Sequence, residues 1–394
     1  MIPNAPAFTD IAGVTFQLVT ACNLSCEYCF QDACNVTASP HAEVGKIVDP
    51  LQTAANAIRF LQLSEETPGV VFSGGEPMLV PVDWYRTFFQ TMDDYLQASG
   101  KSVEYTIQTN ISILKPAIID LFKKYNVHFS VHYDGLLDDP KLLCRKRRDN
   151  IITLRRNGFT VTALVVGTAS SLRILPETIA FFREQGIRFY RLNFVSSEGR
   201  GHQVPMTPPK LRAEMEFESA FLASQADFAT RETVILNKFH LYYNNIIRGR
   251  AFNTVPRPQR CLAGIASAYV DAQGLVYPCS FFTHVTGPVA WAKDLPACLE
   301  TGARALERCA EPNSYYDEAC RSCSALPICG EYCALSPVSD THDMASFCAS
   351  QRSLRGLMDK NTDLAELIAK RFIAHKQDHP ADRPVSCGTR TQPQ

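Results

Sequence analysis

The chain has 394 residues, of which 46% are hydrophobic and 20% are charged, and its formal net charge is −1. This composition is that of a globular protein long enough for two or three cores, and the balanced charge excludes a global basic field that would attract nucleic acid or an anionic membrane. No stretch approaches ~18 uninterrupted apolar residues, and the N-terminus lacks a basic region followed by an apolar one. We therefore expect a cytoplasmic protein without a membrane span.

The first half of the chain alternates between strand and helix patterns. Apolar runs predict strands at 14–19, 69–73, 103–108, 127–132, 159–167 and 188–195, and helical spacing lies between them at 51–61, 117–124 and 175–182. Six such units predict an α/β fold with a parallel sheet, curled into a partial (β/α)6 TIM-like barrel. Active sites of such sheets lie at the carboxyl ends of the strands.

The pattern changes after about residue 200. A Gly- and Pro-rich break at 199–209 precedes helical patterns at 210–224 and 231–248, and cysteines are then dense from 261 to 348. Residues 268–279 predict a β-hairpin with Gly274 in its turn and Cys279 at its end. The predicted domains are a barrel at 1–208, a helical bridge at 209–260, a small cysteine-rich domain with the hairpin and helices at 261–360, and a C-terminal helix with a polar tail at 361–394.

The chain contains fifteen cysteines, an odd number without a secretory signal, which favours metal binding over disulfides. Cys22, Cys26 and Cys29 directly follow the first strand with C-x3-C-x2-C spacing. A 4Fe–4S cube needs four ligands, so three cysteines leave one iron open to a small molecule. A zinc knuckle that uses Cys34 as its fourth ligand is the alternative.

Polar groups follow the next strands at the same predicted edge. The second strand ends in Gly74-Gly75-Glu76-Pro77, in which the glycines permit close approach of a ligand and Glu76 can accept from an ammonium group. Without a ligand this run would be a plain turn.

The cysteine triplet, with Tyr28 before its last member, and the Gly-Gly-Glu-Pro run resemble the radical S-adenosylmethionine (radical SAM) superfamily. The resemblance implies that the open iron chelates the amine and carboxylate of SAM, and that reduction of the cluster yields a 5′-deoxyadenosyl radical, which abstracts a hydrogen atom. It also implies an electron donor such as flavodoxin or ferredoxin.

The resemblance further implies SAM contacts along the strand ends. The amine would bind at Gly74, Gly75 and Glu76, and the ribose and carboxylate would lie near four residues of the next two strands, namely Gln108, Asn110, Ser130 and His132. His132 stands where the family pattern has serine. Arg145 or a basic neighbour would bind the carboxylate, unless 145–148 is a solvated helix face. Tyr28 would lie against the adenine, with core packing as the alternative, and Asn193 and Val195 are weaker candidates.

The later cysteines resemble the SPASM domain found in radical SAM enzymes, through seven cysteines and Gly274. The resemblance implies two auxiliary 4Fe–4S clusters, one held by Cys261, Cys279 and Cys333, the other by Cys320, Cys323, Cys329 and Cys348. Two structural zinc ions are the alternative.

Two positions depart from the related anaerobic sulfatase maturases. Ser267 stands where those enzymes complete the first auxiliary cluster with a cysteine, so that cluster has an open iron or recruits Cys298 or Cys309. Ser280 stands where they have a catalytic aspartate, which argues against formylglycine formation. His284 is a candidate base, or a hairpin histidine bonded to backbone. Asp134 and Tyr133 are candidates to face the substrate.

The predicted function is hydrogen abstraction from a peptide, leading to a C–C, C–S or C–O crosslink or an oxidation during ribosomal peptide maturation. Because the first strand begins near residue 14, we expect a separate leader-binding protein or direct recognition of the substrate. The alternatives are a radical SAM enzyme for a small molecule such as a tetrapyrrole or sugar, and a non-catalytic iron–sulfur or zinc protein.

Overall fold

The computed structural model describes residues 13–31, 45–64, 67–135, 143–196, 198–225, 233–249, 267–284, 290–292, 322–329 and 344–378. Their strands form one sheet in the order β6-β5-β4-β3-β2-β1-β7-β8-β9. The six predicted strands are confirmed and run parallel, as β1 (Gly13–Val19), β2 (Gly69–Gly74), β3 (Glu104–Thr109), β4 (His128–His132), β5 (Val161–Gly167) and β6 (Phe189–Phe194).

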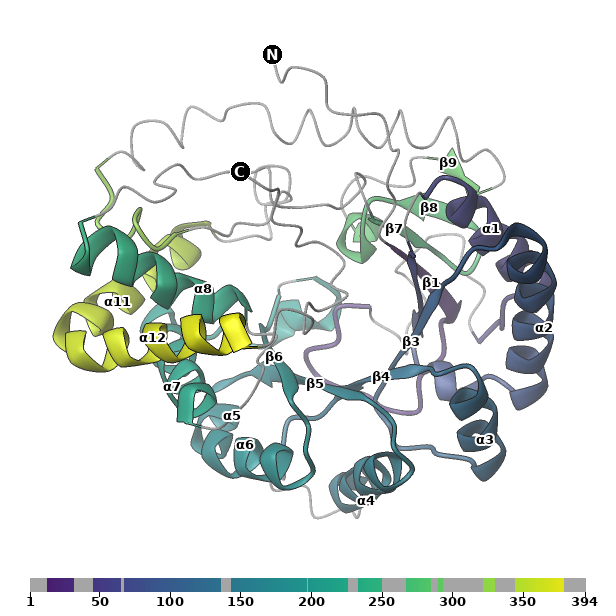
Figure 1. The fold of residues 1–394 in the computed structure, drawn as a ribbon, viewed down its shortest axis with the longest axis horizontal. Helices are drawn as coiled ribbons and strands as arrows, with labels where there is room; N and C mark the ends of the chain where they lie inside the picture. Colours follow the sequence, from purple (N-terminus) through teal and green to yellow (C-terminus); the bar gives the residue numbers. More distant parts are fainter. Residues whose placement is uncertain are drawn as a thin grey trace.

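Helices cover the outer side of this curved sheet (Figure 1). They are α1 (Pro50–Gln62), α2 (Val82–Ser99), α3 (Pro116–Lys124), α4 (Leu143–Arg156), α5 (Ala169–Arg173) and α6 (Leu175–Glu184). Helix α1 begins where the Asp49 carboxylate accepts from the Gln52 N–H at 2.8 Å and Pro50 occupies the first helical position. Helix α2 ends at Gly100, which has the left-handed conformation of a C-terminal cap.

Aromatic side chains fill the layer between the sheet and these helices. Phe72 on β2 lies edge-on to Phe88 of α2, with ring centroids 5.1 Å apart, and Phe122 of α3 packs against Phe129 of β4 at 5.8 Å. These rings are fully buried. Because successive strand residues point to opposite faces, this apolar outer layer leaves the alternate residues for the concave face.

The concave face carries a row of polar side chains. The strand register aligns Gln17 with Ser73, and Gln108 with Ser130 and then Thr162. Ser73 Oγ lies 3.3 Å from Gln108 Oε1 and donates to it. The interior of a complete TIM barrel is usually packed with branched apolar residues. A polar interior at this place indicates a face that receives a polar ligand.

The sheet does not close between its first and sixth strands in the described part of the chain. Strand β1 pairs on its other side with β7 (Ser267–Val270), which continues through β8 (Leu275–Tyr277) to β9 (Ala290–Trp291). The predicted hairpin is thereby confirmed, and Gly274 lies in its turn with a φ of +86°. The hairpin extends the barrel sheet.

A group of helices follows β6 and packs at that end of the sheet (Figure 1). It contains α7 (Pro209–Gln225), α8 (Thr233–Tyr242) with the π-helical turn η3 (Tyr243–Ile247), α11 (Met344–Lys360) and α12 (Thr362–Asp378). The predicted polar tail after residue 378 lies outside the described residues. The domain boundaries stay a prediction.

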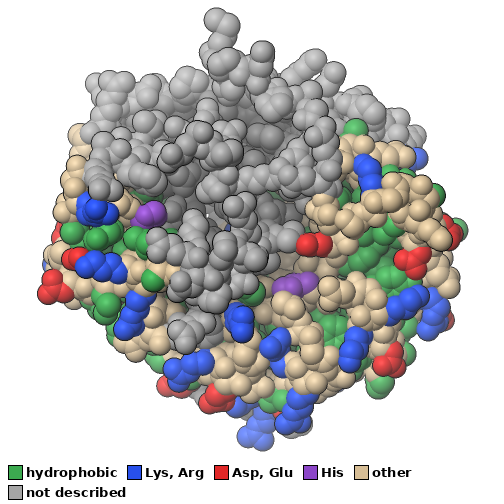
Figure 2. All heavy atoms as spheres, viewed as in Figure 1, with side chains coloured by type: hydrophobic (Ala, Val, Ile, Leu, Met, Phe, Trp, Pro, Cys, Tyr) green, Lys and Arg blue, Asp and Glu red, His purple; other side chains and the backbone are tan. Residues whose placement is uncertain are grey.

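On the described surface that Figure 2 shows, Lys and Arg side chains are interspersed with fewer acidic ones. None of the helices in the described ranges is both long and apolar enough to cross a membrane.

Candidate active site at the carboxyl ends of the strands

The cysteine loop, which we define as residues 20–30, leaves β1 at its carboxyl end. Cys22, Cys26 and Cys29 are all partly exposed on this loop. Two N–H groups approach the Cys22 sulfur, the Leu24 backbone at 3.4 Å and Asn110 Nδ2 at 3.8 Å. Such N–H groups stabilise a cluster thiolate and tune its potential, so the loop has the donor set that an iron–sulfur cluster requires.

Burial raises the pKa of the Cys22 thiol to about 11, against the lowering effect of the Leu24 N–H, and burial also raises the pKa of Cys26. Without metal these thiols hold their protons at neutral pH, so cluster loading releases protons. Within the described ranges, no three Cys, His, Asp or Glu side chains converge on one metal ion. A cube binds each cysteine at a different iron, so its ligands need not converge. Cys34, required for the zinc alternative, lies outside the described residues.

The Gly-Gly-Glu-Pro run packs its backbone directly on the cysteine loop. The Gly75 N–H donates to the Val19 carbonyl at 2.7 Å, and the Glu76 N–H donates to the Ala21 carbonyl at 2.9 Å. A Cβ at Gly74 would lie 2.4 Å from the Val19 oxygen, and one at Gly75 would lie 2.1 Å from the Ala21 oxygen. These glycines were predicted to permit close approach of a ligand, and the structure shows that the approach of the loop backbone already requires them.

Replacing Gly75 with alanine is therefore expected to destabilise the fold by more than about 3 kcal/mol, because the backbone of Ala21 cannot move without displacing the cysteine loop. The matched control is Gly356→Ala in α11, where a Cβ meets nothing within 4 Å and the helix gains up to about 1 kcal/mol. Urea unfolding and iron content of both variants test this. Wild-type stability with full iron loading in Gly75→Ala would contradict it.

The Glu76 carboxylate joins the end of β2 to the end of β3. Its side chain is 1% exposed. Oε1 accepts from the Met78 N–H at 2.8 Å and from Thr109 Oγ1 at 2.6 Å, and Oε2 accepts from the Asn110 N–H at 2.8 Å. Burial raises the pKa of Glu76, although these three hydrogen bonds act to lower it. Oε2 retains capacity for one more donor, which leaves room for the SAM amine. Binding of that amine by Glu76 stays a prediction.

Asn110 connects β3 to the cysteine loop. Its Nδ2 donates to Asn23 Oδ1 at 3.1 Å, and its Oδ1 accepts from the Ser112 N–H at 2.9 Å. Asn23 in turn donates to Ser112 Oγ at 2.8 Å. The predicted SAM contact Asn110 thus also fixes the loop, a contact that local sequence does not reveal.

The arginine at these strand ends is Arg147. Its side chain is buried, Nε donates to the Asn110 carbonyl at 2.9 Å, and Nη2 donates to the His132 carbonyl. Arg145, the predicted ligand of the SAM carboxylate, is exposed on α4. The structure therefore places a neighbour of Arg145, and not Arg145 itself, at the site.

Tyr28 and Asp134 form a second connection across the site. The Tyr28 hydroxyl donates to Asp134 Oδ2, and Asp134 Oδ1 accepts from the Val166 N–H at 2.8 Å. Asp134 thus fixes the ring of Tyr28 relative to β5. Tyr133 was expected to face the substrate. Its ring is instead buried on the helix side of the sheet, with its centroid 5.5 Å from that of Phe181 in α6.

His132 points to the concave face beside Gln108, and Gln108 Nε2 lies 3.2 Å from His132 Nε2. Desolvation lowers the pKa of His132 to about 4; the Asp134 charge raises it and Arg147 lowers it further. The imidazole is therefore neutral at physiological pH. Ser130 on β4 and Asn193 on β6 are partly buried, and Val195 is buried just beyond β6.

We expect the neutral imidazole of His132 to make stability depend on pH. The pKa of His132 is lower in the folded state than in the unfolded state. The stability that its neutral form contributes is therefore complete above about pH 6.5 and is lost as the pH falls from there toward 4. Between pH 7 and pH 5 wild type should lose about 1–2 kcal/mol more than His132→Gln, which keeps a partner for Gln108. Urea unfolding at the two pH values measures the difference, and equal losses would contradict the shift.

The segments after β6 and β8 also contact the cysteine loop. The ring of Phe281, in the turn η5 (Ser280–His284), stacks on that of Phe30 with centroids 4.9 Å apart. The Arg200 N–H, in the turn η2 (Gly199–Gln203), donates to the Cys29 carbonyl at 3.0 Å. Neither contact was predicted from the sequence, because both join segments far apart in the chain.

Several predicted residues are only partly covered by the structure. Cys279, Cys323, Cys329 and Cys348 are described and partly exposed. The side chain of His284 and the cysteines at 261, 320 and 333 lie outside the described residues, as do Cys298 and Cys309. The ligand sets of the auxiliary clusters therefore stay a prediction.

Comparison with known proteins identifies this arrangement. Residues 16–182 match the family model of the radical SAM superfamily. The chain contains a radical SAM domain. The match begins in β1 and ends in α6, so it spans the cysteine loop and the first five strands. Membership implies one 4Fe–4S cluster and bound SAM, which fits the sulfur donors and strand-end contacts described above.

Similarity to known proteins extends beyond this domain. The chain is 24% identical over 376 residues to the cysteine-type anaerobic sulfatase-maturating enzyme of Clostridium novyi (strain NT), covering 90% of this chain and 96% of that enzyme. Its fold resembles that of native anSMEcpe with bound AdoMet and Cp18Cys peptide, with a TM-score of 0.69, 16% identity, and coverage of 90% and 99%. It also resembles Streptococcus suis SuiB bound to precursor peptide SuiA, with a TM-score of 0.53, 16% identity, and coverage of 84% and 74%.

Proposed function

We propose that this radical SAM enzyme modifies a peptide, by hydrogen abstraction from a side chain that leads to a crosslink or an oxidation. The observation that carries the proposal is the open sheet formed by the described strands, in which β6 is an edge and β1 pairs with β7 instead of with β6. An open, polar concave face accommodates an extended chain. The similar folds of anSMEcpe and SuiB were each solved with a peptide.

The cysteine loop would hold the SAM cluster through Cys22, Cys26 and Cys29. When bound, the cluster and SAM supply a 5′-deoxyadenosyl radical. The protein's own contribution is positioning, since Glu76 and Arg147 lock the ends of β2, β3 and β4 around the loop. Asp134 orients Tyr28, whose ring would lie against the adenine.

Two auxiliary clusters would take up the second electron of the oxidation. We assign Cys261, Cys279 and Cys333 to one and Cys320, Cys323, Cys329 and Cys348 to the other. The stacking of Phe281 on Phe30 supports a position for Cys279 near the cysteine loop, because Cys279 lies just before the turn that contacts this loop. A flavodoxin or ferredoxin would reduce the SAM cluster, and a separate leader-binding protein would present the peptide.

Sulfatase maturation is the second candidate, favoured by similarity to the Clostridium novyi enzyme over 90% of this chain. Against it stands Ser280 at the first position of η5, where the maturases to which the sequence is similar have a catalytic aspartate. A serine hydroxyl is a poor general base at neutral pH, so it cannot replace that carboxylate directly.

Co-expression with small peptides encoded beside the enzyme tests the proposal by mass spectrometry. We expect one peptide to lose two hydrogen atoms, and to remain unchanged with the Cys26→Ala variant. A sulfatase-derived peptide converted to formylglycine would support the second candidate instead. Formation of 5′-deoxyadenosine with no change in any peptide would contradict both and favour a small-molecule substrate.

A further inference from the structure

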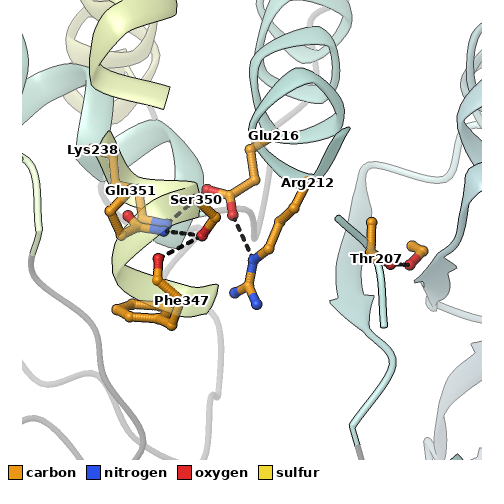
Figure 3. Close-up of polar contacts among 8 residues, drawn as sticks. Thr207, Arg212, Glu216, Lys238, Phe347, Ser350 and Gln351 are labelled. Atoms are coloured by element: carbon orange, nitrogen blue, oxygen red, sulfur yellow. Dashed lines mark hydrogen bonds and ion pairs between the residues drawn. The ribbon is translucent and has the colours of Figure 1, made fainter. Parts of the chain in front are cut away.

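A charged group lies outside the SAM site, where α7, α8 and α11 meet (Figure 3). Glu216 on α7 pairs with Lys238 on α8 at 2.8 Å and with Arg212, one helical turn before it, at 3.2 Å. The side chains of Glu216 and Lys238 are 2% and 5% exposed, and that of Arg212 is 25% exposed. Only the arginine of this group is accessible to a ligand.

The group carries an unbalanced positive charge. Burial acts to raise the pKa of Glu216, but the charges of Lys238 and Arg212 outweigh it and lower the pKa, so the carboxylate is ionised. Two cations then share one anion. Lys238 is enclosed, so the surplus charge is available at Arg212, in surroundings that screen it less than water does.

The guanidinium of Arg212 is held in a fixed orientation. Its central carbon lies 4.3 Å from the ring centre of Phe194 and 5.4 Å from that of Phe347, while Nε donates to Glu216 Oε1. Among the described interactions its two terminal nitrogens have no hydrogen-bond partner, and Figure 3 shows them turned away from Glu216. A planar fork with two free donors binds a carboxylate in bidentate geometry.

This fork lies at the carboxyl end of β6, on the side of the sheet that faces α7. Phe194 is the last residue of β6, and its ring packs against Gly167 at the end of β5, where a Cβ would lie 2.8 Å from it. The carboxyl ends of parallel strands share one edge, so Arg212 and the cysteine loop lie on the same edge of the sheet. Phe347, on the other side of Arg212, immediately precedes Cys348 on α11.

We propose that Arg212 binds a carboxylate of the substrate peptide at the β6 edge of the open barrel, with Glu216 as the residue that positions it. The inference rests on the proposed peptide substrate. It commits to a carboxylate, from an acidic side chain or from the C-terminus of the peptide. Recognition of such a group would set the register of the peptide relative to the radical.

Four acetylated hexapeptide probes separate these sources. They are otherwise identical and carry Glu with a C-terminal amide, Gln with a C-terminal amide, Gln with a free C-terminus, and Glu with a free C-terminus. Binding to the reconstituted holoenzyme is measured by saturation-transfer NMR. We expect either the Glu or the free C-terminus to tighten binding about 10-fold over the doubly neutral peptide, as a charge-assisted bidentate pair does.

Variants assign this preference to the arginine. Arg212→Gln should abolish it, and Arg212→Lys should retain part of it, because lysine keeps the charge but not the fork. Arg355→Gln is the matched control, since Arg355 also pairs with a carboxylate four residues away and lies over a tyrosine ring. It should keep the full preference. Iron content and uncoupled SAM cleavage report whether each variant is folded.

Equal binding of all four peptides to wild type would overturn the inference without requiring any variant. So would a preference that Arg212→Gln and Arg355→Gln lose alike. If peptides are modified but show no carboxylate preference, the proposed function stands and this inference fails. If carboxylate probes bind through Arg212 but no peptide is ever modified, the proposed function fails. The inference then fails with it, because it states that the bound carboxylate belongs to the substrate peptide.

Discussion

Replacing Cys22, Cys26 and Cys29 together with alanine is expected to remove about four irons per chain and abolish the reductive cleavage of SAM. The three sulfurs are the thiol ligands of the cysteine loop, which Asn110 and Arg200 contact at Cys22 and Cys29. Without them neither amine nor carboxylate of SAM has an iron to chelate. Iron analysis and chromatography of 5′-deoxyadenosine, under dithionite in an anaerobic chamber, measure both effects.

The aromatic layer between sheet and helices does not involve the cysteine loop, so we expect this triple variant to keep its far-UV circular dichroism. Cys144→Ala, at a cysteine outside all three proposed sets of cluster ligands, is the control and should retain both iron and SAM cleavage. Surviving formation of 5′-deoxyadenosine in the triple variant would refute the assignment of these cysteines.

Replacing Cys320 and Cys323 with alanine is expected to separate SAM cleavage from product formation. If the second auxiliary cluster accepts the electron left after hydrogen abstraction, its loss leaves the substrate radical without an oxidation path. Iron should fall from about twelve to about eight per chain, SAM should still be cleaved, and no modified peptide should accumulate.

Misfolding is the competing explanation for that loss, because Cys323 packs at the edge of the hydrophobic core. Thermal unfolding and uncoupled SAM cleavage distinguish misfolding from loss of the electron acceptor. A misfolded chain loses both its cooperative unfolding transition and its SAM cleavage. Cys387→Ala, in the predicted polar tail, is the control. Normal peptide turnover in the double variant would show that the second cysteine array is dispensable.

Local pattern predicted most of the barrel because its strands are short apolar runs bounded by breaks, and all six lie within two residues of the prediction. Helix α2 was not singled out, although Trp84, Phe88 and Met92 recur on one face and are buried. The same period-two rule that puts Ser130 and His132 on the concave face puts Tyr133 on the helix side, so its burial there follows from the sequence.

Other parts of the site depend on contacts that no local pattern carries. In the basic run of α4, only the packing of the helix decides that Arg147 is buried and Arg145 exposed. The pairing of β7 with β1 joins segments about 250 residues apart, and so does the stacking of Phe281 on Phe30. The glycines of the Gly-Gly-Glu-Pro run were located correctly, but the backbone that crowds them is visible only in three dimensions.

Electron–nuclear double resonance of the reduced enzyme with SAM labelled by 15N in its amino group tests most directly whether the cysteine loop leaves an iron for SAM. We predict a 15N hyperfine coupling that is present in wild type, absent from the triple cysteine variant, and unchanged by loss of Cys320 and Cys323. A reduced cluster at Cys22, Cys26 and Cys29 whose spectrum shows no nitrogen coupling, with saturating SAM, would contradict the account.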